Sequence, residues 1–498
     1  MTSIARSYHE ATKHSFESVR RRGQFLDWSN KPQPFKVYEG QPQLSLPREI
    51  PALGVAALDA MARSGSVRQL GDLDVRGVAR LLFLAAGVHR AVDAGGGGRI
   101  LFRTYASAGA LYPVELYLAC GGIPGIDAGL YHFDPLGFSL TRLRKEDPRP
   151  ALVRAAGGEP ALSTARLILI LTGMPWRTAW KYAERGYRHL FWDAGMILAN
   201  LITTASATDL PAAVILGFDD DEVEELLGLD ARREFPLCLV KLDTGDPVEP
   251  ADGRPEPMDS RDRPLSHREH EFESIRRVND SGKLEASEVA AWRSRGAEVA
   301  GPVVNTRPNW DYPKDPLDEV IRRRGSARFF SRGAMPDRVL ATTLGLDTLS
   351  IWTDYGDHLI EPYVIANAVE GLDPGAYVYR QGGLELLRAG DFRREAGYLC
   401  LEQRLAADAA AAIFLMADLD GVLDALGDRG YRAAQLEGGI VAGRIYLGAY
   451  AHRFGATGLT FYDDDVTEFF SPDAAGKSCM LVVVVGESPR LAMTARVS

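Results

Sequence analysis

Arg185-Gly186-Tyr187-Arg188 recurs as Arg429-Gly430-Tyr431-Arg432, and this repeated stretch decides how the 498 residues are organised. The second copy begins 244 positions after the first, the difference between 429 and 185. The same offset, carried on without a gap, aligns Asp193 with Glu437, Gly195 with Gly439, and the aspartates 219–221 with the aspartates 463–465. A register kept over this distance predicts an internal duplication.

Two upstream segments resemble each other at slightly different offsets, as insertions in one copy would produce. Gly65-Ser66-Val67-Arg68 resembles Gly325-Ser326-Ala327-Arg328, and residues 129–133 (GLYHF) resemble residues 375–379 (GAYVY). The stretch between the copies is rich in proline and charged residues, which is typical of a linker. We therefore predict an N-terminal domain over 1–245, a linker with a helical lead-in over 246–300, and a C-terminal domain over 301–498.

Each copy shows the same order of apolar segments. Short apolar runs predict buried strands at 116–119, 167–171, 412–416 and 481–485. A long helix is expected after each Arg-Gly-Tyr-Arg motif. In the first copy six apolar residues fall at helical spacing on one predicted buried face: Leu190, Phe191, Ala194, Ile197, Leu198 and Leu201. Strands mixed with long helices indicate an α+β fold.

The second long helix carries glycines, each of which weakens a helix interior by roughly 1 kcal/mol. They are Gly438, Gly439, Gly443 and Gly448. Something must approach this backbone closely, most simply the matching helix of the other copy. Two copies packed through their long helices would form a pseudo-dimer within one chain.

Composition excludes several classes of function. A net charge of −10 argues against a surface for nucleic acid or anionic membrane. No apolar run reaches the ~18–20 residues needed to cross a bilayer, and the first residues lack the pattern of a signal peptide, so we expect a cytoplasmic protein. The four cysteines lack close pairs and are expected to be buried, reduced thiols. The nine histidines show no metal-ligand spacing, so no metal site is expected.

A loop of small residues is the first candidate for a binding site. Ser107-Ala108-Gly109 follows Arg103 and precedes Tyr112-Pro113, so its backbone could approach a flat ligand without an intervening side chain. An ordinary turn would have the same pattern of small residues. The aligned stretch of the second copy, 355–363 (YGDHLIEPY), has lost these small residues.

An arginine cluster in the second copy is the second candidate. Arg322-Arg323-Arg324-Gly325-Ser326-Ala327-Arg328 could bind a phosphate through guanidinium and hydroxyl hydrogen bonds, although arginine runs are often only solvated surface. The first copy has two arginines at 63–68 (RSGSVR), where this segment has four. Each copy keeps what the other has lost, which predicts one composite site between the halves.

Lys181 and Tyr182 form the third candidate. The second copy has Ala425 and Leu426 at these positions, so the pair belongs only to the half that kept the loop. A lysine or tyrosine beside a cationic site could serve as general base or acid. A surface lysine beside a packing tyrosine is the alternative.

These motifs, with the opening Tyr8-His9-Glu10-Ala11-Thr12-Lys13-His14-Ser15, resemble the FMN-dependent nitroreductase superfamily and, within it, the SagB-type dehydrogenases, which include azoline oxidases of modified-peptide pathways. The resemblance implies a mixed central sheet flanked by helices in each of two tandem domains, with FMN between them. It implies that Arg324, Gly325, Ser326 and Arg328 hold the phosphate and ribityl chain, and that Arg103, Ser107, Ala108 and Gly109 lie beside the isoalloxazine. Thr460 and Phe461 would supply a backbone donor near N5, and Arg490 a further basic group. Lys181 and Tyr182 match the pair that azoline oxidases use for proton removal.

The resemblance further implies that a substrate carbon loses a hydride to flavin N5 while a base takes the adjacent proton. We therefore expect an FMN-dependent oxidoreductase that acts on a small-molecule or modified-peptide substrate, with one FMN per chain and no nucleic-acid or membrane partner. Further association between chains stays open. The alternatives are an NAD(P)H-dependent nitroreductase or quinone-type reductase, and a degenerate flavoprotein that serves as a non-catalytic scaffold subunit.

Overall fold

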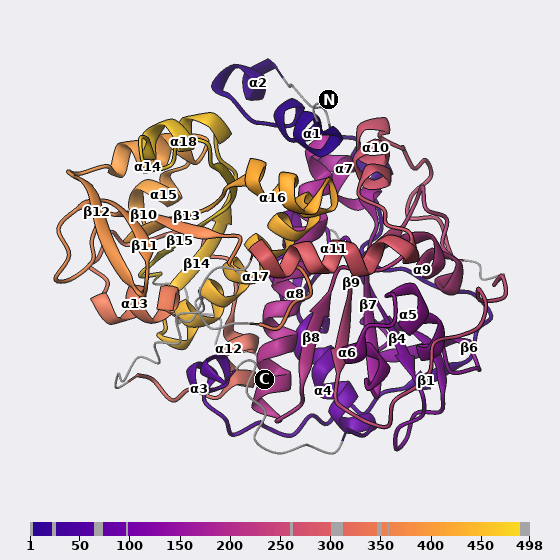
Figure 1. Ribbon diagram of the computed structural model, residues 1–498. Helices are drawn as coiled ribbons and strands as arrows, with labels where there is room; N and C mark the ends of the chain where they lie inside the picture. Colours follow the sequence, from indigo (N-terminus) through magenta and orange to yellow (C-terminus); the bar gives the residue numbers. More distant parts are fainter. Residues whose placement is uncertain are drawn as a thin grey trace.

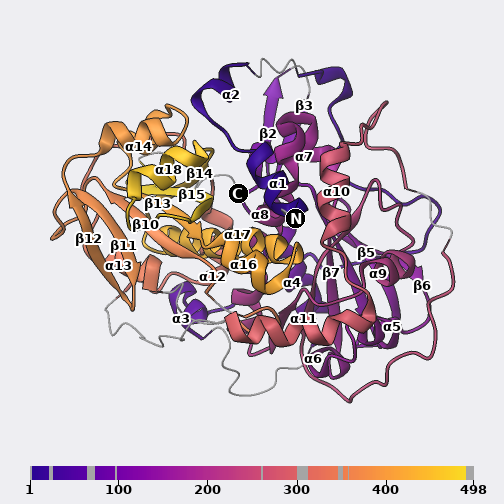
Figure 2. The same cartoon turned by 45° about the horizontal axis from the view of Figure 1, so that its top comes forward.

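Two antiparallel sheets, one in each half of the chain, organise the molecule (Figure 1). The computed structural model describes residues 3–21, 26–63, 73–95, 98–258, 262–299, 312–345, 351–356 and 358–488. The first sheet has the order β1-β6-β5-β4-β7-β9-β8 and the second β12-β11-β10-β13-β15-β14. A separate hairpin, β2 with β3, stands at the edge of the first half (Figure 2).

The strands of the first half are β1 (Gln43–Ser45), β2 (Val88–Gly95), β3 (Gly98–Arg103), β4 (Val114–Cys120), β5 (Gly129–Asp134), β6 (Ser139–Arg144), β7 (Leu167–Gly173), β8 (Ala212–Ile215) and β9 (Phe235–Leu242). Those of the second half are β10 (Glu361–Ala366), β11 (Gly375–Arg380), β12 (Gly383–Ala389), β13 (Ala411–Ala417), β14 (Gly455–Leu459) and β15 (Ser478–Gly486). The four predicted strands are confirmed as parts of β4, β7, β13 and β15. Val214, on β8, forms a parallel β-bridge with Thr353 of the other half.

The helices up to residue 227 are α1 (Ile4–Ala11), α2 (Phe16–Arg21), α3 (Ala57–Ala62), α4 (Val75–Ala86), α5 (Arg149–Ala155), α6 (Pro160–Ser163), α7 (Pro175–Tyr182), α8 (Gly186–Ala207) and α9 (Asp220–Leu227). The predicted lead-in contains α10 (Glu273–Ser281) and α11 (Ala286–Val299). The remaining helices are α12 (Leu317–Arg323), α13 (Asp337–Gly345), α14 (Arg393–Leu399), α15 (Arg404–Asp408), α16 (Leu419–Leu426), α17 (Arg429–Ala451) and α18 (Asp463–Phe470).

The two halves repeat the same elements, which confirms the tandem α+β fold. β7, α7 and α8 are followed by β8, α9 and β9, as β13, α16 and α17 are followed by β14, α18 and β15. The ungapped register fails by one residue at the aspartate turn. Asp220, and not Asp219, opens its helix and pairs with two arginines as Asp463 does. The first copy has one residue more between β8 and this helix.

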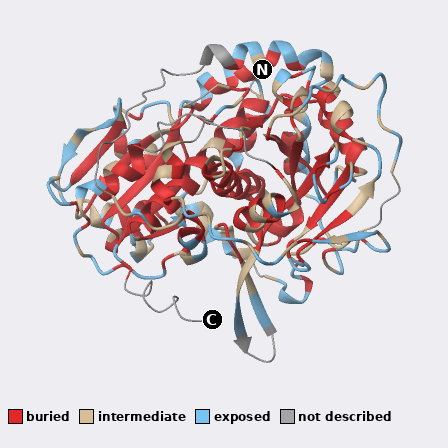
Figure 3. Cartoon of the chain, turned by 90° about the horizontal axis from the view of Figure 1, so that it is seen from below, coloured by how far each residue is buried: buried red, intermediate tan, exposed pale blue. Residues whose placement is uncertain are grey.

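The long helices α8 and α17 pack directly on each other. Figure 3 shows buried helices, drawn in red, at the centre of the molecule. A Cβ at Gly439 would lie 2.7 Å from the carbonyl oxygen of Trp192, and one at Gly443 would lie 2.5 Å from the Cβ of Ala199. The predicted approach of the matching helix is thus confirmed at these two glycines. The prediction of a single buried face on α8 is wrong, because the helix has the sheet on one side and α17 on the other. Nearly every residue of it is buried.

The helical stretch 175–207 is long and apolar enough to span a membrane by length and composition, yet 94% of its most apolar window is buried inside the molecule. It is therefore a core helix. The four cysteines are buried and free, as predicted.

Candidate functional site

Lys181 and Tyr182 converge on the small-residue loop at Gly109. A Cβ at Gly109 would lie 3.1 Å from the Lys181 Nζ and 3.2 Å from the Tyr182 hydroxyl oxygen. Gly109 also has a φ of 65°, and Ala110 and Tyr112 share this left-handed region with φ of 52° and 50°. Non-glycine residues held there store backbone strain, which collects at functional sites. Glycine at 109 is what lets both side-chain tips reach the loop.

The loop is fixed from below by Asp193 of α8. Its Oδ1 accepts a hydrogen bond of 3.3 Å from the Ala108 N–H, while the Ser107 hydroxyl accepts one of 2.9 Å from the Tyr112 N–H. Burial of the Asp193 carboxyl raises its pKa to about 7, although hydrogen bonds from Ser107 and Ala108 act in the opposite direction. The Oδ2 atom is buried and has no partner within the described part of the chain. Asp193 thus holds the loop with a carboxyl group that titrates near neutral pH.

The surroundings of the Lys-Tyr pair lower the pKa of the lysine and raise the pKa of the tyrosine. Partial burial lowers the pKa of Lys181, and the nearby positive charges of Arg328 and Lys31 lower it further. Burial raises the pKa of Tyr182, so its phenol stays protonated. The Tyr182 ring is held by His189, which stacks on it at a centroid distance of 4.1 Å. A neutral amine can accept a proton and a neutral phenol can donate one, so the pair is equipped for acid–base chemistry.

The arginine cluster of the second half reaches the loop of the first half. Arg324 donates to the carbonyl oxygens of Thr104, at 2.9 Å from Nε, and Arg103, at 3.3 Å from Nη2. The Ser326 hydroxyl lies 3.3 Å from the Tyr446 hydroxyl, and Gly325 lies beside Tyr450. Segments 103–109 and 324–328 therefore meet across the interface between the halves, as the complementary motif losses predict.

The other predicted site residues occupy different settings. Arg103 is buried, donates to the Pro34 carbonyl and packs its guanidinium over the rings of Phe35 and Tyr112. These contacts indicate that Arg103 supports the loop by packing against its neighbours. The Thr460 hydroxyl accepts a hydrogen bond of 3.3 Å from Gln403.

Phe461 is buried, with the Arg185 guanidinium 5.0 Å from its ring centroid. Arg490 lies outside the described residues.

The donor set suits a flat ligand with a phosphate group. Within the described part of the chain, Arg328 forms no ion pair, and its charge is felt by Lys181 and Tyr182 beside the loop. The N–H groups of Thr460 and Phe461 have no hydrogen-bond acceptor among the described residues. An unpaired cation near a loop with no bulky side chains matches the needs of FMN. We regard these residues as fitting that cofactor.

Two residues of this site were not among the sequence candidates. Asp193 was visible only as the partner of Glu437 in the repeat alignment, and its burial below the loop depends on tertiary packing. His189 lies on α8 one helical turn before Asp193, where its ring meets Tyr182. The helical spacing could have placed both on one face of α8, but not against the loop.

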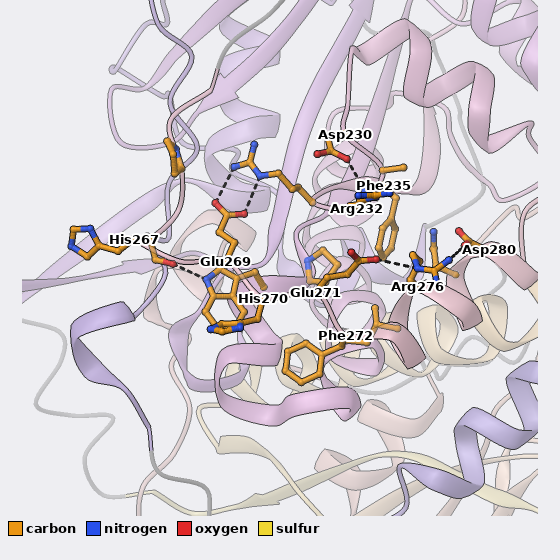
Figure 4. Close-up of a pocket in the computed structure, with 18 residues that line it drawn as sticks. Asp230, Arg232, Phe235, His267, Glu269, His270, Glu271, Phe272, Arg276 and Asp280 are labelled. Carbon is orange, nitrogen blue, oxygen red and sulfur yellow. Dashed lines mark hydrogen bonds and ion pairs between the residues drawn. The ribbon is translucent and has the colours of Figure 1, made fainter.

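A cavity of about 380 Å³ lies elsewhere, between the start of α7, the loop 230–235 and α10 (Figure 4). Several of its charged side chains are paired: Arg233 with Glu269, and Arg276 with Glu271 and Asp280. Trp176 donates to the Ser266 hydroxyl. None of the predicted site residues lines this cavity.

Comparison with known proteins identifies relatives. Residues 82–242 match the model of the nitroreductase family. A nitroreductase-type protein of Methanocaldococcus jannaschii is 30% identical over 184 residues, which are 36% of this chain and 87% of that protein. The microcin B17-processing protein McbC of Escherichia coli is 29% identical over 142 residues, 28% of this chain and 52% of McbC.

A solved structure shares the whole architecture. The crystal structure of a nitroreductase-type protein from Anabaena variabilis matches with a TM-score of 0.78 and 26% identity. The match covers 98% of this chain and 100% of that one, so both halves and their arrangement recur there.

Proposed function

The chain belongs to the nitroreductase family, and from this membership we propose that it is an FMN-dependent oxidoreductase with one composite active site. The observation that carries the proposal is the convergence of Lys181 and Tyr182 on Gly109, beside the arginine segment of the second half. The likeness to McbC supports a SagB-type dehydrogenase or oxidase that acts on a peptide-derived or other small biosynthetic substrate.

Each group in the site has a distinct task in this proposal. Ser326 and Arg328 would hold the phosphate and ribityl chain. Arg324, which donates to the carbonyl oxygens of Thr104 and Arg103, would hold the loop 107–109 against the ring system. When bound, FMN supplies the hydride acceptor. Lys181 takes the proton next to the carbon that is oxidised, because its lowered pKa makes the neutral amine more accessible than in an exposed lysine. Tyr182 keeps its proton and orients or donates to the substrate.

Substitution of the pair tests this assignment. Lys181→Ala and Tyr182→Phe should each lower the turnover of an azoline-containing peptide by about 10²–10⁴-fold, the usual contribution of acid–base catalysis. Both variants should keep the flavin absorbance of the wild type. Lys181→Arg is the sharper control, because arginine keeps the positive charge but cannot act as a base. Wild-type turnover in Lys181→Arg would contradict the role of Lys181 as base.

A second candidate is an NAD(P)H-dependent reductase. The similarity to the Methanocaldococcus jannaschii nitroreductase-type protein supports a reductase, because it covers 87% of that protein. The match to McbC covers only 52% of McbC. Anaerobic mixing with NAD(P)H distinguishes the two functions. Rapid bleaching of the flavin band identifies the reductase, whereas bleaching by an azoline substrate alone identifies the dehydrogenase.

A further inference from the structure

The duplication creates a second place where a cofactor could lie, on the opposite side of the long helices. Three elements of the proposed site have counterparts there among the described residues. Ala425 and Leu426 correspond to Lys181 and Tyr182, and the segment 351–356 corresponds to the loop before β4. Phe218 corresponds to Phe461, because each ring lies under an arginine of the repeated motif. Leu216 and Gly217, which precede Phe218, therefore correspond to Thr460.

Helix α11 contacts all three of these counterparts. The Trp292 side chain is fully buried, and its Nε1 donates to the Leu426 carbonyl at 2.9 Å. Arg295 donates to the Ala425 carbonyl at 2.9 Å. Gly296 lies so close to the backbone of Tyr355 that a Cβ would come within 2.8 Å of its Cα.

Polar groups at the second place are also satisfied from within the chain. The buried Asp354 carboxylate accepts hydrogen bonds from the N–H groups of Leu216, at 2.7 Å, and Gly217, at 2.9 Å. Arg293 of α11 pairs with this carboxylate at 3.3 Å and donates to the Gly217 carbonyl at 3.2 Å. The matching N–H group of Thr460 has no such acceptor in the described part of the chain.

The segment with α1 and α2, before the first domain, and the segment with α10 and α11, before the second, occupy equivalent positions. Arg188 donates to the His9 carbonyl, and Arg432 donates to the Asn279 carbonyl, each while paired with an aspartate of the repeated turn. α10 is thus the counterpart of α1, and α11 is the counterpart of α2. α2 has six residues and no buried side chain, whereas α11 has 14 residues and inserts Trp292.

We propose that α11 is a built-in occupant of the second cofactor place, so that this place binds the chain's own helix and no flavin. The proposal rests on the proposed FMN site, whose counterpart it describes. The interface that α11 fills is an intramolecular docking surface made by Ala425, Leu426, Tyr355 and Gly217. Figures 1 and 2 show α11 passing from α16 of the second half to the first half.

Titration of flavin-free full-length protein with FMN tests the number of sites. One FMN per chain is expected, and two per chain would overturn the proposal. No binding at all would instead contradict the proposed function, so the two failures are distinct.

Variants of α11 test the occupant itself. Trp292→Ala and Arg293→Ala should lower Tm by several degrees, equally with and without FMN, and leave the FMN Kd unchanged. Ser294→Ala is the matched control, since its hydroxyl bonds only to Ala290 of the same helix, and it should behave as wild type. A change of threefold or more in the FMN Kd of either variant would overturn the proposal. If both variants fail to fold, hydrogen exchange of the wild type decides: α11 amides should be equally protected with and without FMN, and protection gained on FMN binding would contradict the assignment.

Discussion

Individual side chains in this protein take their chemistry from the other elements around them. Lys181 is an ordinary lysine by sequence, and only partial burial with Arg328 and Lys31 nearby lowers its pKa. Asp193 shows the same dependence more strongly, because complete burial under the loop raises its pKa to about 7. The residue types could be read from the chain, but the protonation states depend on packing.

The pH dependence of stability should report the Asp193 carboxyl. Its pKa is about 7 in the folded protein, against 3.8 for an ordinary aspartate, so between these values the folded state binds the extra proton. Stability should therefore fall as pH rises from about 4 to about 7 and level off above this window. Asp193→Asn should remove this component while keeping an acceptor for Ala108. Urea unfolding of both proteins across the window measures it, and parallel stability curves would contradict the assignment.

At the scale of elements, the contact between α8 and α17 sets the geometry of the interface. The glycines of α17 predicted a close neighbour, and Gly439 and Gly443 do meet α8. Gly438 instead faces Met480 of β15, and Gly448 faces Thr343 of α13. A glycine pattern thus indicates that backbones approach, but which neighbour approaches depends on how the helix is rotated in the core.

Gly439→Ala should separate the two helices. The new methyl group would lie 2.7 Å from the Trp192 carbonyl, with only backbone atoms of α8 to yield. Overpacking of this kind costs about 1–3 kcal/mol, more than the gain in helix propensity. Gly438→Ala is the matched control in the same helix, since its nearest neighbour is a side-chain atom at 3.3 Å. Chemical unfolding should show a loss only for Gly439→Ala, and equal stability of the two variants would contradict the close contact.

At the scale of the whole molecule, two buried ionic clusters join the halves. Asp463 of the second half accepts from Arg185 and Arg188 of the first, at 2.8 Å each. In the other half, Asp220 pairs with Arg429 and Arg432, at 2.5 and 2.6 Å. All of these side chains are buried, so each cluster fixes the relative position of the halves and of the site between them.

Asp463→Asn and Asp220→Asn should each destabilise the protein strongly. Removing the carboxylate leaves two buried guanidinium groups without a counter-charge, which costs about 3–5 kcal/mol. Asp464→Asn is the control, because its side chain is 74% exposed and its ion pair with Lys13 is worth less than about 1 kcal/mol. Thermal unfolding would show whether the losses differ as expected.

Acid should weaken the same two clusters. Burial alone would raise the pKa of Asp463 and Asp220, but their paired arginines lower both pKa values below the 3.8 of an ordinary aspartate. Their contribution to stability is therefore present above about pH 4 and is lost as the carboxylates become protonated at lower pH. The two variants should lose less stability than the wild type over this acid range, and equal acid sensitivity would contradict the clusters' role.

The sequence by itself determined the duplication, the order of the main elements and the complementary loss of motifs, because periodicity and repetition are local properties of the chain. The tertiary structure decided what those motifs touch. It moved the paired aspartate from 219 to 220, placed Asp193 below the loop and used Arg324 to hold carbonyls of the other half. It also packed α11 against Leu426 and Gly217. Each of these outcomes depends on burial and on partners 76 to 220 residues away in the sequence, which no local pattern records.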